Sequence, residues 1–245
     1  MRTKSIEDVL NQAVAGADWW GGASKWVYQD KQYDEIRLKP MNDGGYLTYI
    51  TGEGREDFSH EQVVKTVWKH QDKLDQKMDG CVAAEQVGRG TDPKVGTDYV
   101  DLYMFLDFGV FYAEFFQRMY KYPQPDGRTL MAFEKLFAPM VDGATWAKYQ
   151  EKRRATLARL EDAGELRSIF NKKVEVSETY GVFIADKGSR QASRISMVAK
   201  IGFDSSSGFI AQMGSKMPPV IKAGLRAGFD ASVAIAKGVK TGRYR

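Results

Sequence analysis

The chain has 245 residues, of which 43% are hydrophobic and 28% charged, so its composition excludes a disordered, collagen-like or disulfide-scaffold protein. Its 36 basic and 32 acidic side chains leave a formal net charge of +4 and are interspersed along the chain, which argues against nucleic acid as a partner. The single cysteine, Cys81, excludes an internal disulfide.

The first part of the chain alternates amphipathic helices with short strands. Ser5 and Asp8 form a capping-box pattern, after which apolar residues repeat at helical spacing as far as Ala17. The runs "KWVYQD", "YDEIRLKP" and "GYLTYITGEG" then predict an antiparallel meander. Ser59 and Gln62 mark the start of a second helix. Its predicted buried face comprises Val63, Val64, Val67 and Trp68.

The two strands that follow show alternating polarity. In "DYVDLYMFLDF" the even positions are all apolar, while Asp101 and Asp107 stand at odd positions, so one face is predicted to be buried. In "FYAEFFQRMYKY" the odd positions are mostly apolar, which assigns Glu114 and Arg118 to the outer face as a solvated pair. A helix over residues 109–120 is the alternative, because long apolar runs fit both structures. The turn "PQPDGR" then leads into a further strand, "TLMAFEKL".

The last part of the chain contains a charged helix, a hairpin and a long closing helix. The charged amphipathic helix is predicted over residues 143–166, and the hairpin strands follow it. Apolar residues 174, 176, 180, 182 and 184 are assigned to the first hairpin strand, and residues 195–203 supply the second. The closing helix is predicted over residues 217–238. A one-faced antiparallel sheet must cover its apolar side, so we expect one α+β domain over residues 1–245 in a helix-grip arrangement.

This order of elements resembles the steroidogenic-acute-regulatory-related lipid-transfer (START) domains of the helix-grip superfamily. The resemblance rests on "DWW", on "GEGREDFSHEQVVKTVWKH", on the hairpin "VFIADKGSRQASRISMVAKIGFD" and on "SSSGFIAQMGSKMPPVIKAGL" before the closing helix. It implies a curved sheet around the closing helix, an internal hydrophobic cavity, and binding and intermembrane transfer of one lipid, such as a sterol or phospholipid. The inserted helix at 143–166 departs from the family pattern and leaves the ligand class open.

The cavity implied by the resemblance would be lined by the apolar strand faces and by the closing helix. The candidate cavity residues are Met104, Leu106, Phe108, Phe111, Phe115, Met131, Phe133, Met197, Ile201, Phe203, Ile221, Gly224, Leu225 and Gly228. The candidate polar groups that could orient a headgroup are Glu85, Arg89, Glu114, Arg118 and Glu134. The candidate gate residues are Trp146, Tyr149, Phe209 and Met213, and the latter pair could touch a membrane transiently.

The closing helix has one face that is almost bare of side chains. This face comprises Gly224, Ala227, Gly228, Ala231 and Ser232. Two interpretations stay open: close packing of the helix on the sheet, or a wall of the ligand chamber. A glycine pair within a membrane is set aside because Lys222, Arg226 and Asp230 occupy the same turns.

Catalytic, metal-binding and nucleotide-binding signatures do not occur in the sequence, so we expect a binding protein without cofactor or metal. We expect the two histidines, His60 and His70, at solvated positions. The alternatives are a polyketide cyclase or aromatase-like enzyme, with Asp107, Tyr112 or Glu114 as acid–base groups in the same cavity, and an interaction module with a filled core.

Two further features bear on location. The sequence has no run of 18 uncharged apolar residues, which excludes a membrane-spanning helix. The segment "MRTKSIEDVLNQAVAGADWW" lacks the continuous apolar core of a signal peptide. We therefore expect a soluble protein, cytoplasmic unless a signal peptide has been removed.

Overall fold

A computed structural model describes residues 26–30, 33–40, 46–53, 60–76, 78–94, 96–109, 111–123, 129–166, 173–187 and 193–204, together with residues 221, 226–228, 230, 231, 233 and 234. The strands within these residues are β1 (Trp26–Asp30), β2 (Tyr33–Pro40), β3 (Tyr46–Glu53), β4 (Cys81–Asp92), β5 (Thr97–Asp107), β6 (Tyr112–Pro123), β7 (Thr129–Lys135), β8 (Lys173–Lys187) and β9 (Ser193–Phe203). The helices are α2 (His60–Lys69), α3 (Gly143–Asp162) and the 3₁₀ helices η2 (Gln71–Gln76) and η3 (Ala138–Met140).

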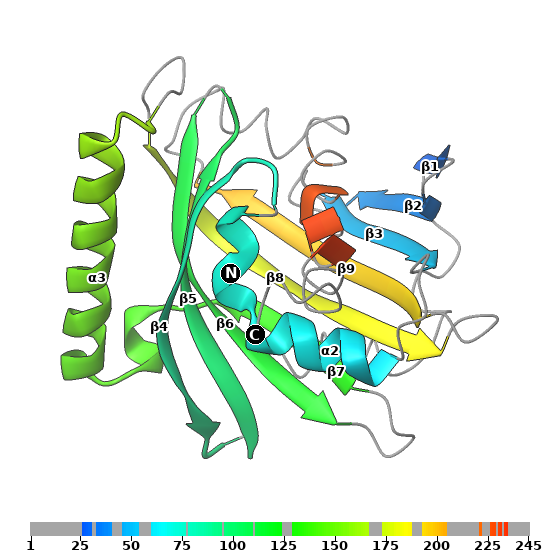
Figure 1. The fold of residues 1–245 in the computed structure, drawn as a ribbon, viewed down its shortest axis with the longest axis horizontal. Helices are drawn as coiled ribbons and strands as arrows, with labels where there is room; N and C mark the ends of the chain where they lie inside the picture. The colour runs from blue at the N-terminus through cyan, green and yellow to red at the C-terminus, as the bar shows by residue number, and fades with distance from the viewer. Residues whose placement is uncertain are drawn as a thin grey trace.

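The nine described strands form one curved sheet in the order β1-β2-β3-β9-β8-β7-β6-β5-β4 (Figure 1). Neighbouring strands in this order are antiparallel, and a short parallel contact joins β6 to β8, where Tyr112 pairs with Lys173. The predicted meander, the later hairpin and the strand interpretation of β6 are therefore confirmed. The helical alternative for residues 109–120 is wrong, because β6 pairs along its length with β5 and β7 and is buried on both faces of the sheet.

The concave face of the sheet carries the main hydrophobic core. In β5 the even positions Val100, Leu102, Met104 and Leu106 all belong to this core. Helix α2 packs on the same face through Val63, Val64 and Val67, as the sequence predicted. The described residues of the closing segment are helical and also lie here, with Ala231 fully buried (Figure 1). The predicted first helix lies outside the described residues.

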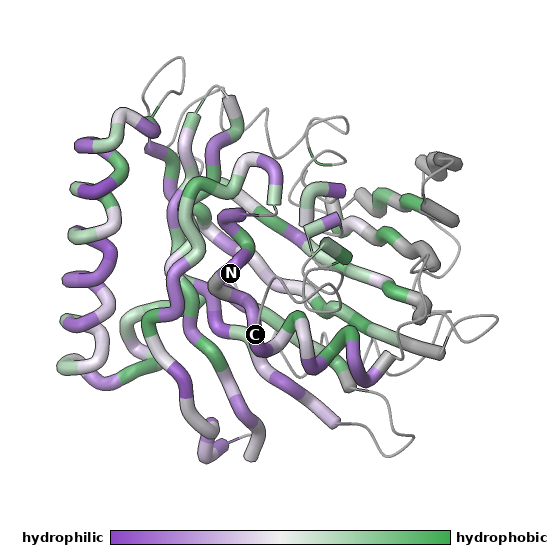
Figure 2. Tube along the Cα trace, in the orientation of Figure 1, coloured by the Kyte–Doolittle hydropathy of each residue, from purple (hydrophilic) through white to green (hydrophobic). Residues whose placement is uncertain are grey.

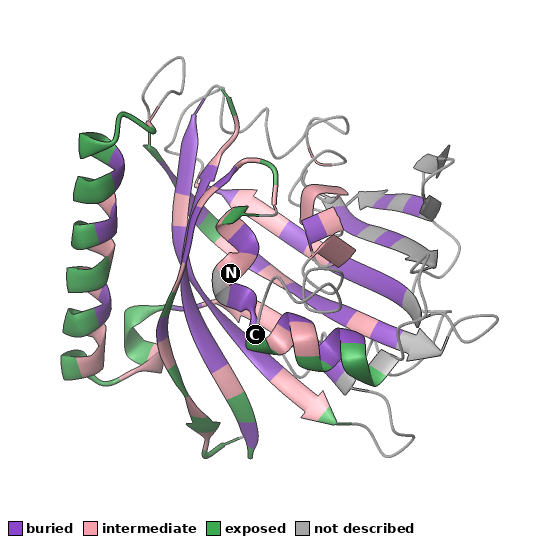
Figure 3. Ribbon diagram, viewed as in Figure 1, coloured by how far each residue is buried: buried purple, intermediate pink, exposed green. Residues whose placement is uncertain are grey.

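The convex face carries a second core, which is covered by α3. Asp142 caps this helix, since its carboxylate accepts a hydrogen bond from the Thr145 backbone N–H at 2.9 Å. Tyr149 and Leu160 point from α3 into a cluster with Tyr103 and Phe105 of β5. Figure 3 shows the buried and half-buried side of α3 turned toward the sheet and its exposed side turned away. The odd positions of β5 are therefore buried as well, because an inserted helix covers them.

Strand β8 changes face part-way along its length. A register irregularity lies between Val176 and Glu178 where β8 pairs with β9. Val174 and Val176 consequently belong to the concave core, whereas Tyr180, Val182 and Ile184 lie in a cluster on the other face. The prediction that these five residues form one strand is confirmed, but they lie on two faces of the sheet, because a bulge reverses the alternation of side chains. The hydropathy pattern along the strands is drawn in Figure 2.

Candidate functional site

A cavity of about 580 Å³ lies between the concave face, the α2–η2 segment and the closing helix. Its wall combines strands from most of the sheet, from Thr48 of β3 across to Leu106 of β5. The strand faces reach it because the concave sides of β5, β6, β7, β8 and β9 all point toward this space. The volume falls within the range of small-molecule binding pockets.

Most of the sequence-predicted cavity residues are brought together here. Those that line it are Met104, Leu106, Phe108, Phe115, Met131, Phe133, Met197, Ile201, Phe203, Ile221 and Gly228. Phe111 lies behind the wall, where its ring centroid is 5.1 Å from that of Phe108 and 5.3 Å from that of Phe203. Gly224 and Leu225 lie outside the described residues, as do the predicted gate residues Phe209 and Met213.

Gly228 of the closing helix faces both the sheet and the cavity. A Cβ atom built on it would lie 3.3 Å from Met197 Cε and 3.7 Å from Met197 Sδ. The neighbour is thus the free end of a flexible side chain, which can move, and Gly228 also lines the cavity. Of the two interpretations of the bare helix face, this geometry favours a chamber wall at Gly228.

Other lining residues were absent from the predicted set. They include Val67, Leu74 and Met78 from α2 and its continuation, Met119 from β6 and Phe183 from β8. The alternation in β6 could have identified Met119, and the predicted buried face of α2 already contained Val67. Phe183 could not be found by simple alternation, because the bulge before it reverses the face of β8.

No known family model matches the sequence, and no curated protein matches it in sequence. Solved structures are similar in fold. The human StAR-related lipid transfer protein 5 superposes with a TM-score of 0.58 at 10% identity, over 95% of each chain. A STAR-related lipid transfer protein fragment from Xanthomonas axonopodis gives 0.57 at 10% identity, over 86% of this chain and 97% of that one. Human STARD10 gives 0.57 at 8% identity, over 97% of this chain and 82% of that one.

The chain has a START-like helix-grip fold. The predicted fold class, an α+β helix-grip arrangement with a curved antiparallel sheet, is confirmed. Identities of 10% or less establish the fold and leave the ligand open.

On the convex side of this START-like sheet, α3 is held by a buried charged pair. Arg118 donates two hydrogen bonds to Asp101, from Nε to Oδ1 at 2.7 Å and from Nη2 to Oδ2 at 2.8 Å. Asp101 is fully buried and Arg118 is 4% exposed. The Tyr149 hydroxyl donates to Asp101 Oδ2 at 2.8 Å. The predicted solvated state of Arg118 is therefore wrong, because α3 covers the outer face of β6.

The gate prediction for Trp146 and Tyr149 is also corrected. Both belong to the convex cluster, where the Trp146 ring lies 5.0 Å from the Phe116 ring. Gly88 leaves room for this packing, since a Cβ on it would lie 1.8 Å from Tyr149 Oη. These two aromatic residues secure α3 to the sheet on the side opposite the cavity.

Replacing Tyr149 with phenylalanine distinguishes a role in holding α3 on the sheet from a role in gating the cavity. The substitution removes one hydrogen bond to a buried carboxylate, so we expect the free energy of unfolding to fall by about 2 kcal/mol. Ligand uptake should stay unchanged, because Tyr149 lies on the face opposite the cavity. Denaturant titration and a ligand-binding assay on the same preparation would test this, and loss of uptake at full stability would restore the gate role.

The polar residues proposed from sequence lie away from the cavity. Arg153 Nε donates to Glu114 Oε2 at 2.9 Å, and the Tyr103 hydroxyl donates to the same oxygen at 2.7 Å. Burial raises the pKa of Glu114, but these hydrogen bonds outweigh it and hold the pKa below its usual range. Glu85, Arg89 and Glu134 are likewise absent from the described cavity wall.

Of the three acid–base candidates, only Asp107 lines the cavity. Tyr112 belongs to the convex cluster and Glu114 pairs with Arg153 of α3. Tyr112 and Glu114 do not reach the cavity because the even-numbered side chains of β6, including Arg118, point to the convex face. His70, expected in solvent, is 6% exposed at the end of α2.

Cys81 lies in the concave core at the start of β4. Burial raises the pKa of its thiol to about 12, so the nucleophilic thiolate is scarce at neutral pH. We expect Ellman's reagent to modify Cys81 very slowly in the native protein and rapidly in 6 M guanidinium. Fast modification of the native chain would contradict this burial.

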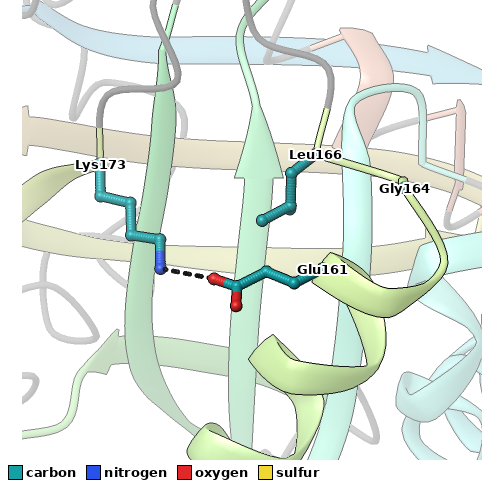
Figure 4. Close-up of a pocket in the computed structure, with 4 residues that line it drawn as sticks. All are labelled: Glu161, Gly164, Leu166 and Lys173. Carbon is teal, nitrogen blue, oxygen red and sulfur yellow. Dashed lines mark ion pairs between the residues drawn. The ribbon is translucent and has the colours of Figure 1, made fainter.

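A second hollow lies at the surface where α3 ends (Figure 4). Glu161, Gly164, Leu166 and Lys173 line it, and Lys173 Nζ lies 3.8 Å from Glu161 Oε1. Glu161, Gly164 and Lys173 are exposed, so this hollow offers little desolvated surface. The concave cavity is the better candidate site.

Neither a metal site nor a membrane-spanning helix occurs among the residues that the structure describes. Those residues contain no group of three or more His, Cys, Asp or Glu side chains placed to hold a metal ion. Their helices include none that is long and apolar enough to cross a membrane.

Proposed function

We propose that residues 1–245 act as a single lipid-binding domain that holds one hydrophobic molecule without covalent chemistry and carries it between membranes. The supporting observation is the cavity of about 580 Å³, whose wall is dominated by methionine, phenylalanine and aliphatic side chains. Such side chains suit a flexible or ring-bearing apolar ligand. The START-like fold agrees with this, since several proteins that share it are lipid transfer proteins.

The size of the cavity also supports a bound ligand. At about 24 cal/mol per Å³, an empty apolar space of this volume would forfeit about 14 kcal/mol. The whole stability of a domain is about 5–15 kcal/mol. We therefore propose that the cavity is filled in the cell, by lipid or in part by water near its polar residues.

For ligand entry, we propose that the segment carrying Phe209 and Met213 contacts the membrane surface. Both side chains are large and apolar, and Gly208 and Gly214 flank them in the sequence. Exchanging both for serine should slow ligand loading from vesicles and leave the affinity for a soluble ligand unchanged.

Transfer between vesicles tests the proposed function. Donor vesicles carrying a self-quenched fluorescent phospholipid or dehydroergosterol are mixed with unlabelled acceptor vesicles. The protein should raise the transfer rate in proportion to its concentration for at least one of the two lipids. Binding without any increase in rate would limit the function to storage, and absence of both binding and transfer would refute the proposal.

A further inference from the structure

Two polar side chains in the cavity wall lack partners within the described residues. Gln117 of β6 is 9% exposed and Thr179 of β8 is 6% exposed, and both line the cavity. Neither side chain makes a hydrogen bond or ion pair with any part of the chain that the structure describes. Their polar atoms are not fully buried but are accessible from the cavity, where water or a polar group of a ligand can satisfy them.

The other buried polar side chains of the wall are accounted for within the protein. The Thr48 hydroxyl donates to the Ala199 carbonyl at 2.6 Å, and Gln71 Nε2 donates to the Val67 carbonyl at 2.7 Å. Gln117 and Thr179 thus differ from their polar neighbours, and the protein leaves their hydrogen-bonding capacity available to the cavity.

The sheet places these two side chains at the same level. Gln117 pairs with Lys135 of β7, and Tyr180 pairs with Glu134, so Thr179 is level with Lys135 on the opposite side of that strand. Two strand spacings therefore separate Gln117 from Thr179, roughly 10 Å between backbones. Both side chains point to the concave face, together with Phe115, Met119 and Phe183.

The charged residues that line the cavity indicate whether the polar group of a ligand would be neutral or charged. Lys200 is the single cation among the described lining residues, and its ammonium pairs with Glu178. The other charged lining residues are the carboxylates of Asp79, which is exposed, and Asp107, which is half-buried. A buried anionic group would find no available cation among the described lining residues, whereas an amide and a hydroxyl suit a neutral group.

We infer that Gln117 and Thr179 form a polar subsite that recognises a neutral hydroxyl or carbonyl group on an otherwise apolar ligand. This inference rests on the proposed function, because it assigns the polar contact within the same cavity. It selects neutral alcohols, ketones or esters over molecules that place a phosphate or carboxylate at this level.

Three ligands with one apolar body and different polar groups test the subsite: biphenyl, 4-hydroxybiphenyl and biphenyl-4-carboxylate. Isothermal titration calorimetry should show that wild-type protein binds 4-hydroxybiphenyl about tenfold more tightly than biphenyl. In a Gln117→Leu/Thr179→Val double variant, this preference should disappear while biphenyl still binds. The matched control is Thr156→Val, which removes a buried hydroxyl from α3 on the convex side.

The outcomes separate the subsite from the cavity itself. A preference for 4-hydroxybiphenyl that survives in the double variant would overturn the assignment of Gln117 and Thr179. Tightest binding of biphenyl-4-carboxylate would overturn the neutral chemistry. Failure of all three ligands to bind wild-type protein would instead contradict the proposed ligand-binding function. Circular dichroism of each variant confirms that the fold persists.

Discussion

Replacing Arg118 with methionine is expected to lower the free energy of unfolding by about 3–5 kcal/mol, the largest effect of any single substitution on the convex side. The variant would leave Asp101 as a fully buried carboxylate with the Tyr149 hydroxyl as its remaining side-chain hydrogen-bond partner among the described residues. Arg118 also stacks on the Tyr99 ring, with 3.8 Å between Cζ and the ring centroid, and that contact would be lost too. Urea denaturation followed by circular dichroism measures the change.

The matched control replaces all three members of the buried polar cluster, Asp101, Arg118 and Tyr149, with apolar side chains. In the triple variant Asp101→Leu/Arg118→Met/Tyr149→Phe the fully buried carboxylate is removed together with its partners, and only the half-buried Asp92, 3.7 Å from Arg118, still loses an ion pair. Most of the lost stability should therefore return. A loss below 1 kcal/mol in the single variant would show that the pair is solvated. A triple variant no more stable than the single one would show that packing, rather than charge, dominates there.

Replacing Gly228 with leucine is expected to lower ligand uptake while the protein still folds. The first added carbon meets only the mobile end of Met197, and the rest of the side chain enters the cavity. Removing a helical glycine also favours folding by up to about 1 kcal/mol. Ligand binding after incubation with lipid vesicles, combined with thermal unfolding, measures both quantities.

Gly228→Ala provides the control for this substitution. A single methyl group requires a shift of a few tenths of an ångström from Met197, so uptake should persist. If Gly228→Leu fails to fold, the bare face of the closing helix serves close packing on the sheet and the chamber wall is wrong. If the leucine variant folds and still binds ligand normally, the cavity at this position is not the binding site.

The concave face was predictable because its information is local. Alternating apolar residues in β5, such as Met104 and Leu106, assign one face of a strand without knowledge of its neighbours, and the Ser59 and Gln62 pattern locates the start of α2. These sequence patterns identify most of the residues that line the cavity. Gly228 could be identified as part of a bare helix face, but not as a neighbour of Met197.

The convex face could not be predicted in the same way. Arg118 and Asp101 stand at positions that alternate with apolar residues, a pattern that normally indicates solvent. Their burial depends on Tyr149, which is 48 residues from Asp101 in the chain and is brought there by a helix docked on the sheet. The reversal in β8 depends on a bulge near Glu178, which the residue pattern does not reveal.

Native mass spectrometry tests the central claim, that the cavity holds one hydrophobic molecule. The protein is incubated with vesicles of mixed cellular lipids, separated from them and sprayed under non-denaturing conditions, and the bound species is identified after extraction. We predict one ligand per chain for the wild type and a smaller ligand-bound fraction for Gly228→Leu. Bare wild-type protein after the same exposure would contradict the account.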